Sequence, residues 1–314
     1  MAVLITGGTG FIGSELARLL IDRGEDVVLF DVNPNPNRVM DILKKVRVVE
    51  GNLAYSSDVY TVIKSHNVNG IYHLGSMLSI PSNKNPWASF QANVVGTVNV
   101  LEAARILEVE TVAFSSSTSS YGLGIESICD DQTIQRPVTM YGCGKLYCEL
   151  VGAFYRNKFK IDFRSIRLPS IIGPGVDTPG IAQYNTLMIE HAINRKNYEC
   201  YVEEDTKTPI MYYKDAARAM YQLFNSPSDQ IKTINYNCSG VTPLKTAKEL
   251  ETTLQKYFPN FQATYNPDQE VMKIHKSRHI DVLDDSRARD EWGWQPGYRS
   301  LEDVVESFIE DARK

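Results

Sequence analysis

The sequence has few of the residues that cross-link a small protein or bind metal ions. Its 314 residues include five cysteines, an odd number, and no two of them stand at Cys-x-x-Cys spacing. The five histidines show no paired helical spacing. We therefore expect neither a disulfide framework nor a metal site. This cysteine usage is typical of a reduced, cytoplasmic protein.

An excess of positive charge and long apolar runs are also missing. A net charge of −5 gives no reason to expect a nucleic acid or an anionic membrane as a partner. No apolar run approaches the ~20 residues of a membrane span, and the first residues do not resemble a secretion signal. With 43% hydrophobic and 23% charged residues, the composition favours a globular cytoplasmic protein of one large or two modest domains.

The first thirteen residues, MAVLITGGTGFIG, are the most informative stretch. An apolar strand at 2–6 leads through glycines into a helix-like run at 14–23. Gly7 allows a tight turn, Gly10 allows the backbone to approach phosphates, and Gly13 allows the helix to pack on the strand. The helix start offers unpaired N–H groups to an anion. The pattern predicts a dinucleotide site, with an ordinary strand–helix turn as the alternative.

Asp31 ends a second apolar strand at 26–30. It lies within the ~20-residue reach expected for a carboxylate that bonds the adenosine ribose hydroxyls. Because a carboxylate there repels a 2′-phosphate, we predict NAD rather than NADP. The alternative is a capping aspartate before Asn33 and Pro34. Arg38 could hold a 2′-phosphate, although an arginine after a loop is usually only solvated.

Strands and helices alternate over the first half of the chain. Further strands are expected at 46–50, 70–74, 111–115 and 161–168, and helices at 58–66, 86–107 (capped by Asn85) and 143–157. Such alternation predicts an α/β protein with a doubly wound parallel sheet, the Rossmann arrangement. After Pro169 the pattern becomes mixed, with helices expected at 184–194, 214–224, 243–257, 286–292 and 300–312.

These changes suggest two units. Residues 1–168 would form the dinucleotide-binding domain, with 208–238 returning to it. A smaller, mixed substrate-binding lobe would comprise 169–207 and 239–314. Ligands of such sheets bind at the carboxyl ends of the strands, where this lobe could close the crevice.

Tyr141 and Lys145 stand four residues apart, so on a helix they share one face. A free tyrosine, with a pKa near ~10, is a poor base at neutral pH. A neighbouring ammonium favours its phenolate and makes it a usable general base. Ser117, at the end of a strand, could hold the substrate oxygen. An exposed helix pair and an ordinary serine-rich loop are the alternatives.

Over essentially its whole length the chain resembles the extended short-chain dehydrogenase/reductases, in the NAD-dependent epimerase/dehydratase group. The matching stretches are the glycine turn, Asp31, Gly51-Asn52-Leu53, Tyr72-His73-Leu74-Gly75-Ser76, Asn93-Val94-Val95-Gly96-Thr97, Ser115-Ser116-Ser117, Tyr121-Gly122, Tyr141 with Lys145, Arg167-Leu168-Pro169, residues 214–219 and Trp292-Gly293-Trp294-Gln295-Pro296.

The resemblance implies that Ser117, Tyr141 and Lys145 are catalytic and that Asn93 supports the active site. It implies an NAD site made of Gly7, Gly10, Phe11, Ile12, Gly13, Asp31, Asn52, Leu53, Leu74, Gly75, Ser76, Asn93, Ser115, Tyr141, Lys145 and Leu168. Asn52 departs from the family's usual aspartate near adenine, although an amide can also contact adenine nitrogens.

Within the group, the chain resembles the short-chain type of L-threonine 3-dehydrogenase. The shared stretches are residues 136–142, 162–172, 196–201, 209–213, 283–286 and 291–293. Residues 203–213 lack the Gly-Asp-Gly turn and the arginine of nucleotide-sugar enzymes. Three acids, Glu203, Glu204 and Asp205, stand where a diphosphate would need cations.

The substrate side departs from that dehydrogenase pattern. Ile181 and Ala182 replace threonines, one of which helps to bind the amino acid, and Arg278-His279-Ile280 replaces a tryptophan-proline. Arg278 is a candidate for bidentate binding of a carboxylate, with a surface arginine as the alternative. We predict substrate contacts from Ser79, Ser117, Tyr141, Ile181 and Arg278.

The sequence thus predicts NAD-dependent oxidation of a secondary hydroxyl in a small polar molecule, a 3-hydroxy acid becoming a 3-keto acid. One alternative is an epimerase or dehydratase of sugars or nucleotide sugars that retains its NAD. Another is a dinucleotide-sensing regulatory protein, which the intact Ser117–Tyr141–Lys145 set disfavours. The resemblance also implies a homodimer that pairs helices 86–107 and 143–157.

Overall fold

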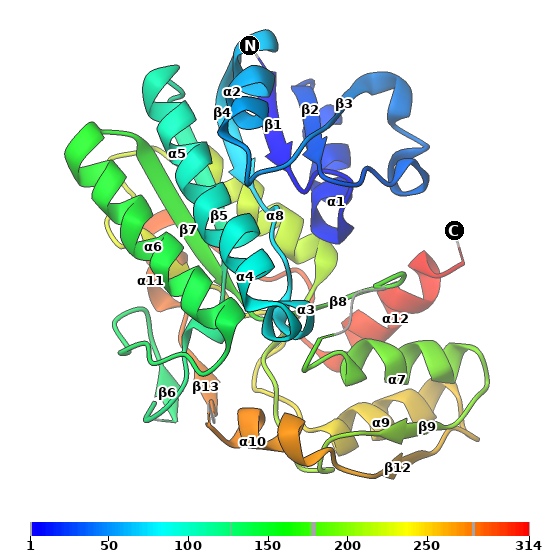
Figure 1. Ribbon diagram of the computed structural model, residues 1–314. Coiled ribbons are helices and arrows are strands. Elements are labelled where there is room, and N and C mark those ends of the chain that lie inside the picture. The colour runs from blue at the N-terminus through cyan, green and yellow to red at the C-terminus, as the bar shows by residue number, and fades with distance from the viewer. Residues whose placement is uncertain (1, 126, 177–179, 278–279, 314) are drawn as a thin grey trace.

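The computed structural model describes residues 2–125, 127–176, 180–277 and 280–313, and its centre is a seven-stranded sheet (Figure 1). The strand order is β11-β7-β5-β4-β1-β2-β3, and every neighbouring pair is parallel. The strands are β1 (Ala2–Thr6), β2 (Asp26–Asp31), β3 (Val46–Glu50), β4 (Val68–His73), β5 (Thr111–Ser117), β7 (Asp162–Leu168) and β11 (Asn235–Asn237). The predicted doubly wound parallel sheet is confirmed.

Helices cover both faces of this sheet because most strand residues are buried and apolar on both sides. One face packs against α1 (Phe11–Ile21), α8 (Tyr213–Asn225) and α11 (Ser286–Trp292). The other packs against α2 (Ser56–Ser65), α5 (Gly96–Ile106) and α6 (Met140–Phe159). Two apolar cores result, one on each side of the sheet.

A third core lies in a smaller lobe at the carboxyl ends of the strands (Figure 1). Its helices are α7 (Tyr184–Ile193), α9 (Ala247–Tyr257), α10 (Gln269–Ser277) and α12 (Leu301–Asp311). Its small parallel pairs are β9 (Tyr198–Cys200) with β12 (Ala263–Tyr265) and β8 (Ser170–Ile172) with β10 (Ile210–Tyr212). A third pair, β6 (Ile128–Cys129) with β13 (Val282–Leu283), lies beside the main sheet.

Two helices differ most from their predicted extents. The helix expected at 86–107 is divided into α4 (Pro86–Ser89), a π-helical segment η3 (Phe90–Val95) and α5. Its predicted cap is confirmed, because the Asn85 side chain accepts the Ala88 N–H at 3.1 Å. The helix expected at 243–257 begins only at Ala247, since Thr246 and Glu249 form a capping box there.

Several short elements were not expected from the sequence. They are α3 (Ser79–Lys84), α10 and the single helical turns η1 (Pro36–Val39), η2 (Leu43–Lys45) and η4 (Thr118–Ser120). The capping-box start of the last helix is confirmed by reciprocal bonds between Ser300 and Asp303.

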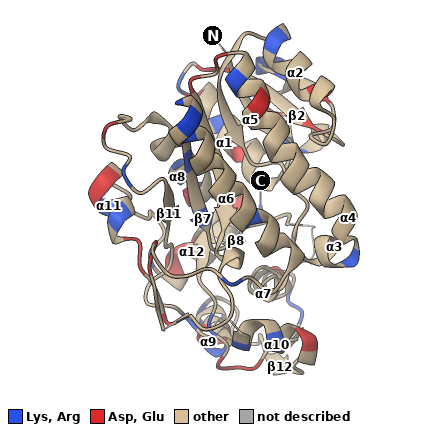
Figure 2. Ribbon diagram, turned by 60° about the vertical axis from the view of Figure 1, so that its left-hand side comes forward, with Lys and Arg blue, Asp and Glu red and all other residues tan. Residues whose placement is uncertain are grey.

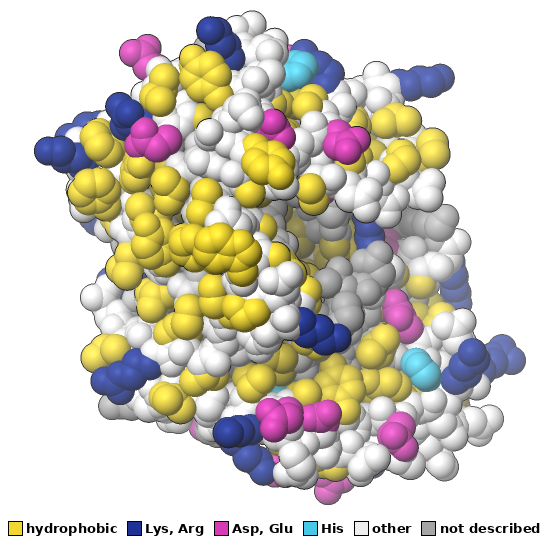
Figure 3. Space-filling model, in the orientation of Figure 1, with side chains coloured by type: hydrophobic (Ala, Val, Ile, Leu, Met, Phe, Trp, Pro, Cys, Tyr) yellow, Lys and Arg dark blue, Asp and Glu magenta, His cyan; other side chains and the backbone are white. Residues whose placement is uncertain are grey.

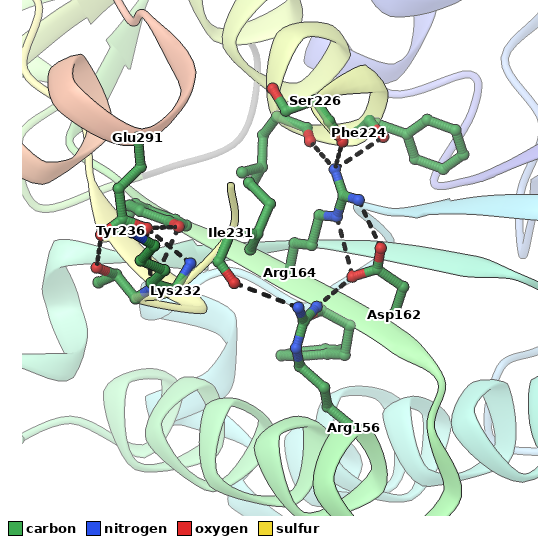
Figure 4. Close-up of polar contacts among 12 residues, drawn as sticks. Arg156, Asp162, Arg164, Phe224, Ser226, Ile231, Lys232, Tyr236 and Glu291 are labelled. Atoms are coloured by element: carbon green, nitrogen blue, oxygen red, sulfur yellow. Dashed lines mark hydrogen bonds and ion pairs between the residues drawn. The ribbon is translucent and has the colours of Figure 1, made fainter. Parts of the chain in front are cut away.

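A polar cluster fixes the helices at the far end of β7 (Figure 4). The buried Arg164 guanidinium donates to the Leu223 and Ser226 carbonyls, each at 2.6 Å, at the end of α8. Asp162 accepts from Arg164 and from Arg156 of α6. A cation therefore satisfies the unpaired carbonyls at the end of α8 and ties two helices to one strand.

Basic and acidic residues are interspersed along the chain (Figure 2). No helix in the part of the chain that the structure describes is long and apolar enough to cross a membrane.

Candidate active site

A cavity of about 1080 Å³ lies between the carboxyl ends of the strands and the lobe. Residues at or after the ends of β1, β2, β4, β5 and β7 form one wall, among them Gly7, Asp31, Leu74, Ser117 and Leu168. Residues of the lobe form the other wall, among them Ile181, Lys207, His275 and Ile280. This is the place where doubly wound sheets bind their ligands.

The glycine turn is tight and close to a second strand. Gly7 has a φ of +65°, which favours glycine, and a Cβ there would lie 2.9 Å from the Gly75 backbone. A Cβ on Gly13 would overlap the Gly7 carbonyl oxygen. Helix α1 then begins at Phe11 without a side-chain cap on its first N–H groups. The backbone thus presents a helix N-terminus to the cavity, as an anion site requires.

Acid and amide groups line the cavity beyond this turn. The Asp31 carboxylate accepts from the Thr9 hydroxyl at 2.8 Å and the Thr9 N–H at 3.2 Å. Asn52 also lines the cavity, and its side-chain oxygen accepts the Ala54 N–H at 2.9 Å. The buried Ser76 hydroxyl has no partner within the described structure, so a polar group is left for a ligand. Glycine turn, helix start, carboxylate and orphaned hydroxyl together fit a dinucleotide.

Ser117, Tyr141 and Lys145 all line the same cavity. Helix α6 begins at Met140, three residues before the predicted start, because the Thr139 hydroxyl accepts the Gly142 N–H at 3.1 Å. Tyr141 and Lys145 therefore lie on one helix, with the Lys145 Nζ 5.4 Å from the centre of the Tyr141 ring. The buried Nζ donates to the Ser115 carbonyl at 2.5 Å, which ties α6 to β5.

Asn93 lies beneath the cavity and does not line it. It is buried in η3, where its side-chain oxygen accepts the Met77 N–H at 2.7 Å and its Nδ2 donates to the Met77 carbonyl at 2.9 Å. The loop after β4, which carries the cavity residues Gly75 and Ser76, is held in this way.

A buried histidine continues this support. The Thr6 hydroxyl lies 2.7 Å from Nδ1 of His73, and Nε2 lies 2.9 Å from the Thr97 hydroxyl. Thr97 donates its own proton to the Asn93 carbonyl at 2.6 Å. Burial, with a smaller contribution from the Lys145 ammonium, lowers the pKa of His73 to about 3. The ring is therefore neutral at physiological pH.

The predicted substrate residues are found in three situations. Ser79, the first residue of α3, lines the cavity, and so does the buried Ile181. Arg278, with its neighbour His279, lies outside the described residues. The acids Glu203, Glu204 and Asp205 are not among the lining residues, whereas Lys207 and Thr208 are.

Other lining residues were missed by the sequence analysis. His275 lies on the unexpected α10, with Nε2 3.4 Å from the Ile181 carbonyl. Gln183 and Thr208 also line the cavity, and Thr208 accepts the Tyr184 hydroxyl at 3.0 Å. The helical spacing of the apolar residues Val271, Met272 and Ile274 could have signalled α10, but no motif pointed to its histidine. Among the described lining residues, Asp31 is the only carboxylate.

No group of three or more His, Cys, Asp or Glu side chains that could hold a metal ion occurs in the described ranges. All five cysteines are free thiols.

Comparison with known proteins agrees with this fold and site. Residues 3–239 match the model of the NAD dependent epimerase/dehydratase family. The chain belongs to this family of NAD-dependent enzymes.

Its relatives include several L-threonine 3-dehydrogenases. The pig protein named "L-threonine 3-dehydrogenase, mitochondrial" is 32% identical, over 98% of this chain and 81% of its own length. The crystal structure of L-threonine dehydrogenase from Phytophthora infestans is 30% identical, with a TM-score of 0.92 and full coverage of both chains. A "monomeric L-threonine 3-dehydrogenase from metagenome database" is 26% identical, with a TM-score of 0.90, over 99% and 98% of the two chains.

Proposed function

We propose that this protein is an NAD-dependent dehydrogenase that oxidises the secondary hydroxyl of a small 3-hydroxy acid, in the manner that the names of its L-threonine 3-dehydrogenase relatives indicate. The observation that carries the proposal is the presence of Ser117, Tyr141 and Lys145 in one cavity with the glycine turn. A general base, Tyr141, and a hydrogen-bond donor for the substrate hydroxyl, Ser117, therefore line the cavity in which a dinucleotide would bind.

Each residue has a distinct role in this proposal. Ser117 donates a hydrogen bond to the substrate oxygen and orients it. Tyr141, as the phenolate, takes the hydroxyl proton as the carbonyl forms and becomes a neutral phenol. The Lys145 ammonium, 5.4 Å from the centre of the Tyr141 ring, offsets the negative charge of the phenolate before that transfer. Bound NAD⁺ would supply the hydride acceptor. Asn93 acts indirectly, because its side chain holds the Met77 backbone beside the cavity.

The cofactor would occupy the wall formed by the sheet. The helix start at Phe11, Ile12 and Gly13 would meet its pyrophosphate, and Asp31 its ribose hydroxyls. Asn52, Leu53, Leu74, Gly75, Ser76, Ser115 and Leu168 line the remainder of that wall.

The substrate would occupy the wall formed by residues 169–207 and 239–314, which we assign as the substrate lobe. Ile181 and Lys207 line this wall, and the Lys207 ammonium forms an ion pair with Asp281 at 3.1 Å. Ser79 lines the cavity from α3, after β4. Because the described lining residues of the lobe include no carboxylate, we favour an acidic substrate. Arg278, by its position in the sequence, is our candidate for binding the substrate carboxylate.

The first experiment compares the wild type, Tyr141→Phe and Tyr147→Phe. NAD⁺ reduction would be followed with threonine, serine, 3-hydroxybutyrate and sugar acids. Tyr147 is a matched control, because it is a half-exposed tyrosine on the same helix. We expect Tyr141→Phe to lose more than about 100-fold in kcat, the usual worth of a general base, with NAD⁺ binding retained. Retention of most activity would sink the proposed mechanism.

The runner-up is an epimerase or dehydratase that keeps its NAD, since the matched family includes both reaction types in its name. Net formation of NADH with one of the hydroxy acids excludes a pure epimerase. Turnover of a sugar nucleotide without net NADH would favour this second function.

We also propose a homodimer formed by α5 and α6. Large apolar side chains gather over these helices and α4 (Figure 3). Leu150 and Phe154 of α6 are 62% and 54% exposed, and Ile106 of α5 is 53% exposed. Their spacing along α6 places Leu150 and Phe154 on one face. Association of this face with a second copy would remove that apolar surface from water.

A further inference from the structure

Helix α6 is joined to strand β5 by two polar contacts in succession. The Lys145 ammonium donates to the Ser115 carbonyl at 2.5 Å. One helical turn later, Glu149 accepts a hydrogen bond from the hydroxyl of the next strand residue, Ser116. Residues four apart on the helix thus meet consecutive residues of the strand, and Ser117 follows directly.

Glu149 is itself firmly held. It is buried, and its carboxylate forms an ion pair with Arg167 of β7, whose Nη2 donates at 2.8 Å and whose Nε donates at 3.0 Å. Gln135 donates to the same carboxylate at 3.1 Å. Four donor groups hold the two oxygens of the Glu149 carboxylate. The helix that carries Glu149 therefore cannot slide without breaking these hydrogen bonds.

Arg167 is held from the other side. Its Nη1 donates to the Tyr121 hydroxyl at 2.7 Å and to the Asp131 carbonyl at 3.0 Å. The Tyr121 hydroxyl lies 2.8 Å from the side-chain oxygen of Asn237 on β11. The network therefore joins α6 to β5, β7 and β11, which are three neighbouring strands of the sheet.

A network of this kind determines register more than stability. The attraction within a buried ion pair roughly offsets the cost of removing the two charges from water, so the pair adds little net stability. It does fix the position of the helix on the sheet, because its hydrogen bonds form in one register only, whereas apolar side chains can pack in several. One residue of slippage on a helix moves a side chain by about 1.5 Å and turns it by about 100°. For Tyr141, two turns before Glu149, such a change would move the phenol relative to Ser117, which lines the same cavity.

We propose that Ser116 and Glu149 are positioning residues, which set the register of α6 on β5 and so place Tyr141 opposite Ser117. The proposal rests on the proposed function for its effect on turnover. Its structural part, the fixed register of α6, does not depend on which substrate is oxidised.

The test uses Ser116→Ala, because removal of Glu149 would leave Arg167 as a buried, unpaired charge and could unfold the protein. Its control is Ser165→Ala. Ser165 is an equally buried serine of β7 whose hydroxyl donates to Asn235 at 2.6 Å. Ser116 lines the cavity and Ser165 does not, so hydrogen exchange along α6, and not kcat alone, separates positioning from direct contact. Ser116→Thr, which keeps the hydroxyl, is the rescue variant.

Two measurements decide the outcome. In Ser116→Ala, kcat should fall by roughly 10-fold or more, since sub-ångström misplacement is costly, while the KM for NAD⁺ stays within about twofold. Ser116→Thr should recover most of kcat, and Ser165→Ala should keep it. Amide hydrogen exchange along 140–149 should accelerate in Ser116→Ala only.

The exchange measurement needs no substrate. If the wild type oxidises none of the hydroxy acids, the proposed function fails while exchange along α6 still tests the register. Exchange that is unchanged in Ser116→Ala, or that accelerates equally in Ser165→Ala, would overturn the positioning role. An unchanged kcat in an otherwise active enzyme would overturn it as well.

Discussion

Single residues at this site are defined by the hydrogen bonds that surround them, and His73 shows this most clearly. The Gly75 N–H donates to the Thr6 hydroxyl oxygen at 3.0 Å, so the Thr6 proton is available for Nδ1 of His73. Thr97 gives its own proton to the Asn93 carbonyl, so its oxygen must accept from Nε2. Only a neutral ring with its proton on Nε2 satisfies both threonines.

This arrangement predicts a specific pH dependence of stability. The pKa of His73 is about 3 in the folded protein and about 6.5 in an unfolded chain. Below pH 6.5 the His73 ring binds a proton in the unfolded state but not in the folded state. The contribution of the neutral, buried ring to the free energy of unfolding is therefore lost as the pH falls from about 6.5 to about 3. The slope is at most about 1.4 kcal/mol per pH unit.

Imidazole ¹⁵N–¹H correlation spectra would test this prediction. We expect a neutral Nε2–H ring for His73 at pH 5, and a His73→Gln variant whose stability depends less on pH across that window. A His73 ring that becomes charged near pH 6.5 in the folded protein would contradict the prediction.

At the scale of elements, the packing at the start of α6 requires a glycine at position 142 but not at position 144. A Cβ on Gly142 would overlap the carbonyl oxygen of Ser119, which lies in η4, two residues after Ser117. A Cβ on Gly144 would lie 3.6 Å from Val94 and 3.8 Å from Asn93, which is ordinary contact.

Alanine substitutions at these two glycines should therefore have opposite effects. Gly144→Ala should stabilise the protein by up to about 1 kcal/mol, the gain in helix propensity. Gly142→Ala should destabilise it by about 1–3 kcal/mol and lower kcat, because the η4 turn must move. Denaturant unfolding of the two variants checks this order, and the reverse order would count against the packing described for this turn.

The sequence predicts elements well where burial alone determines them. Strand β1 matches its predicted residues because its five side chains are apolar or small and fully buried. Element ends were less predictable, since they depend on particular caps: Thr139 extends α6, and Thr246 delays α9. The π-helical segment η3 was not foreseen, because the apolar pattern of 86–107 does not distinguish 3.6 residues per turn from a wider turn.

The residues of the candidate site also fall into a group that the sequence could predict and a group that it could not. Strand-end residues such as Asp31 and Ser117 could be predicted, because motif and topology bring them to one edge. His275 and Thr208 could not, because only the tertiary packing of the lobe brings them to the cavity.

At the scale of the whole molecule, the proposed dimer makes a prediction about mass in solution. We expect Leu150→Glu to yield monomers by sedimentation, because a charge on the paired α6 face cannot be buried without a partner. Ile128→Glu is the matched control, since Ile128 is 60% exposed but belongs to β6 and not to α5 or α6. A wild type that sediments as a monomer would refute the dimer.

The cavity has two walls that come from different parts of the chain. The sheet wall carries the glycine turn and Tyr141, and the lobe wall carries Ile181, Lys207 and His275. Under the proposed function, substitutions in the lobe wall would change the substrate contacts and leave the glycine turn and Tyr141 in place. In evolutionary terms, such a chain would acquire a new substrate through a few lobe substitutions while the NAD chemistry of its family is inherited.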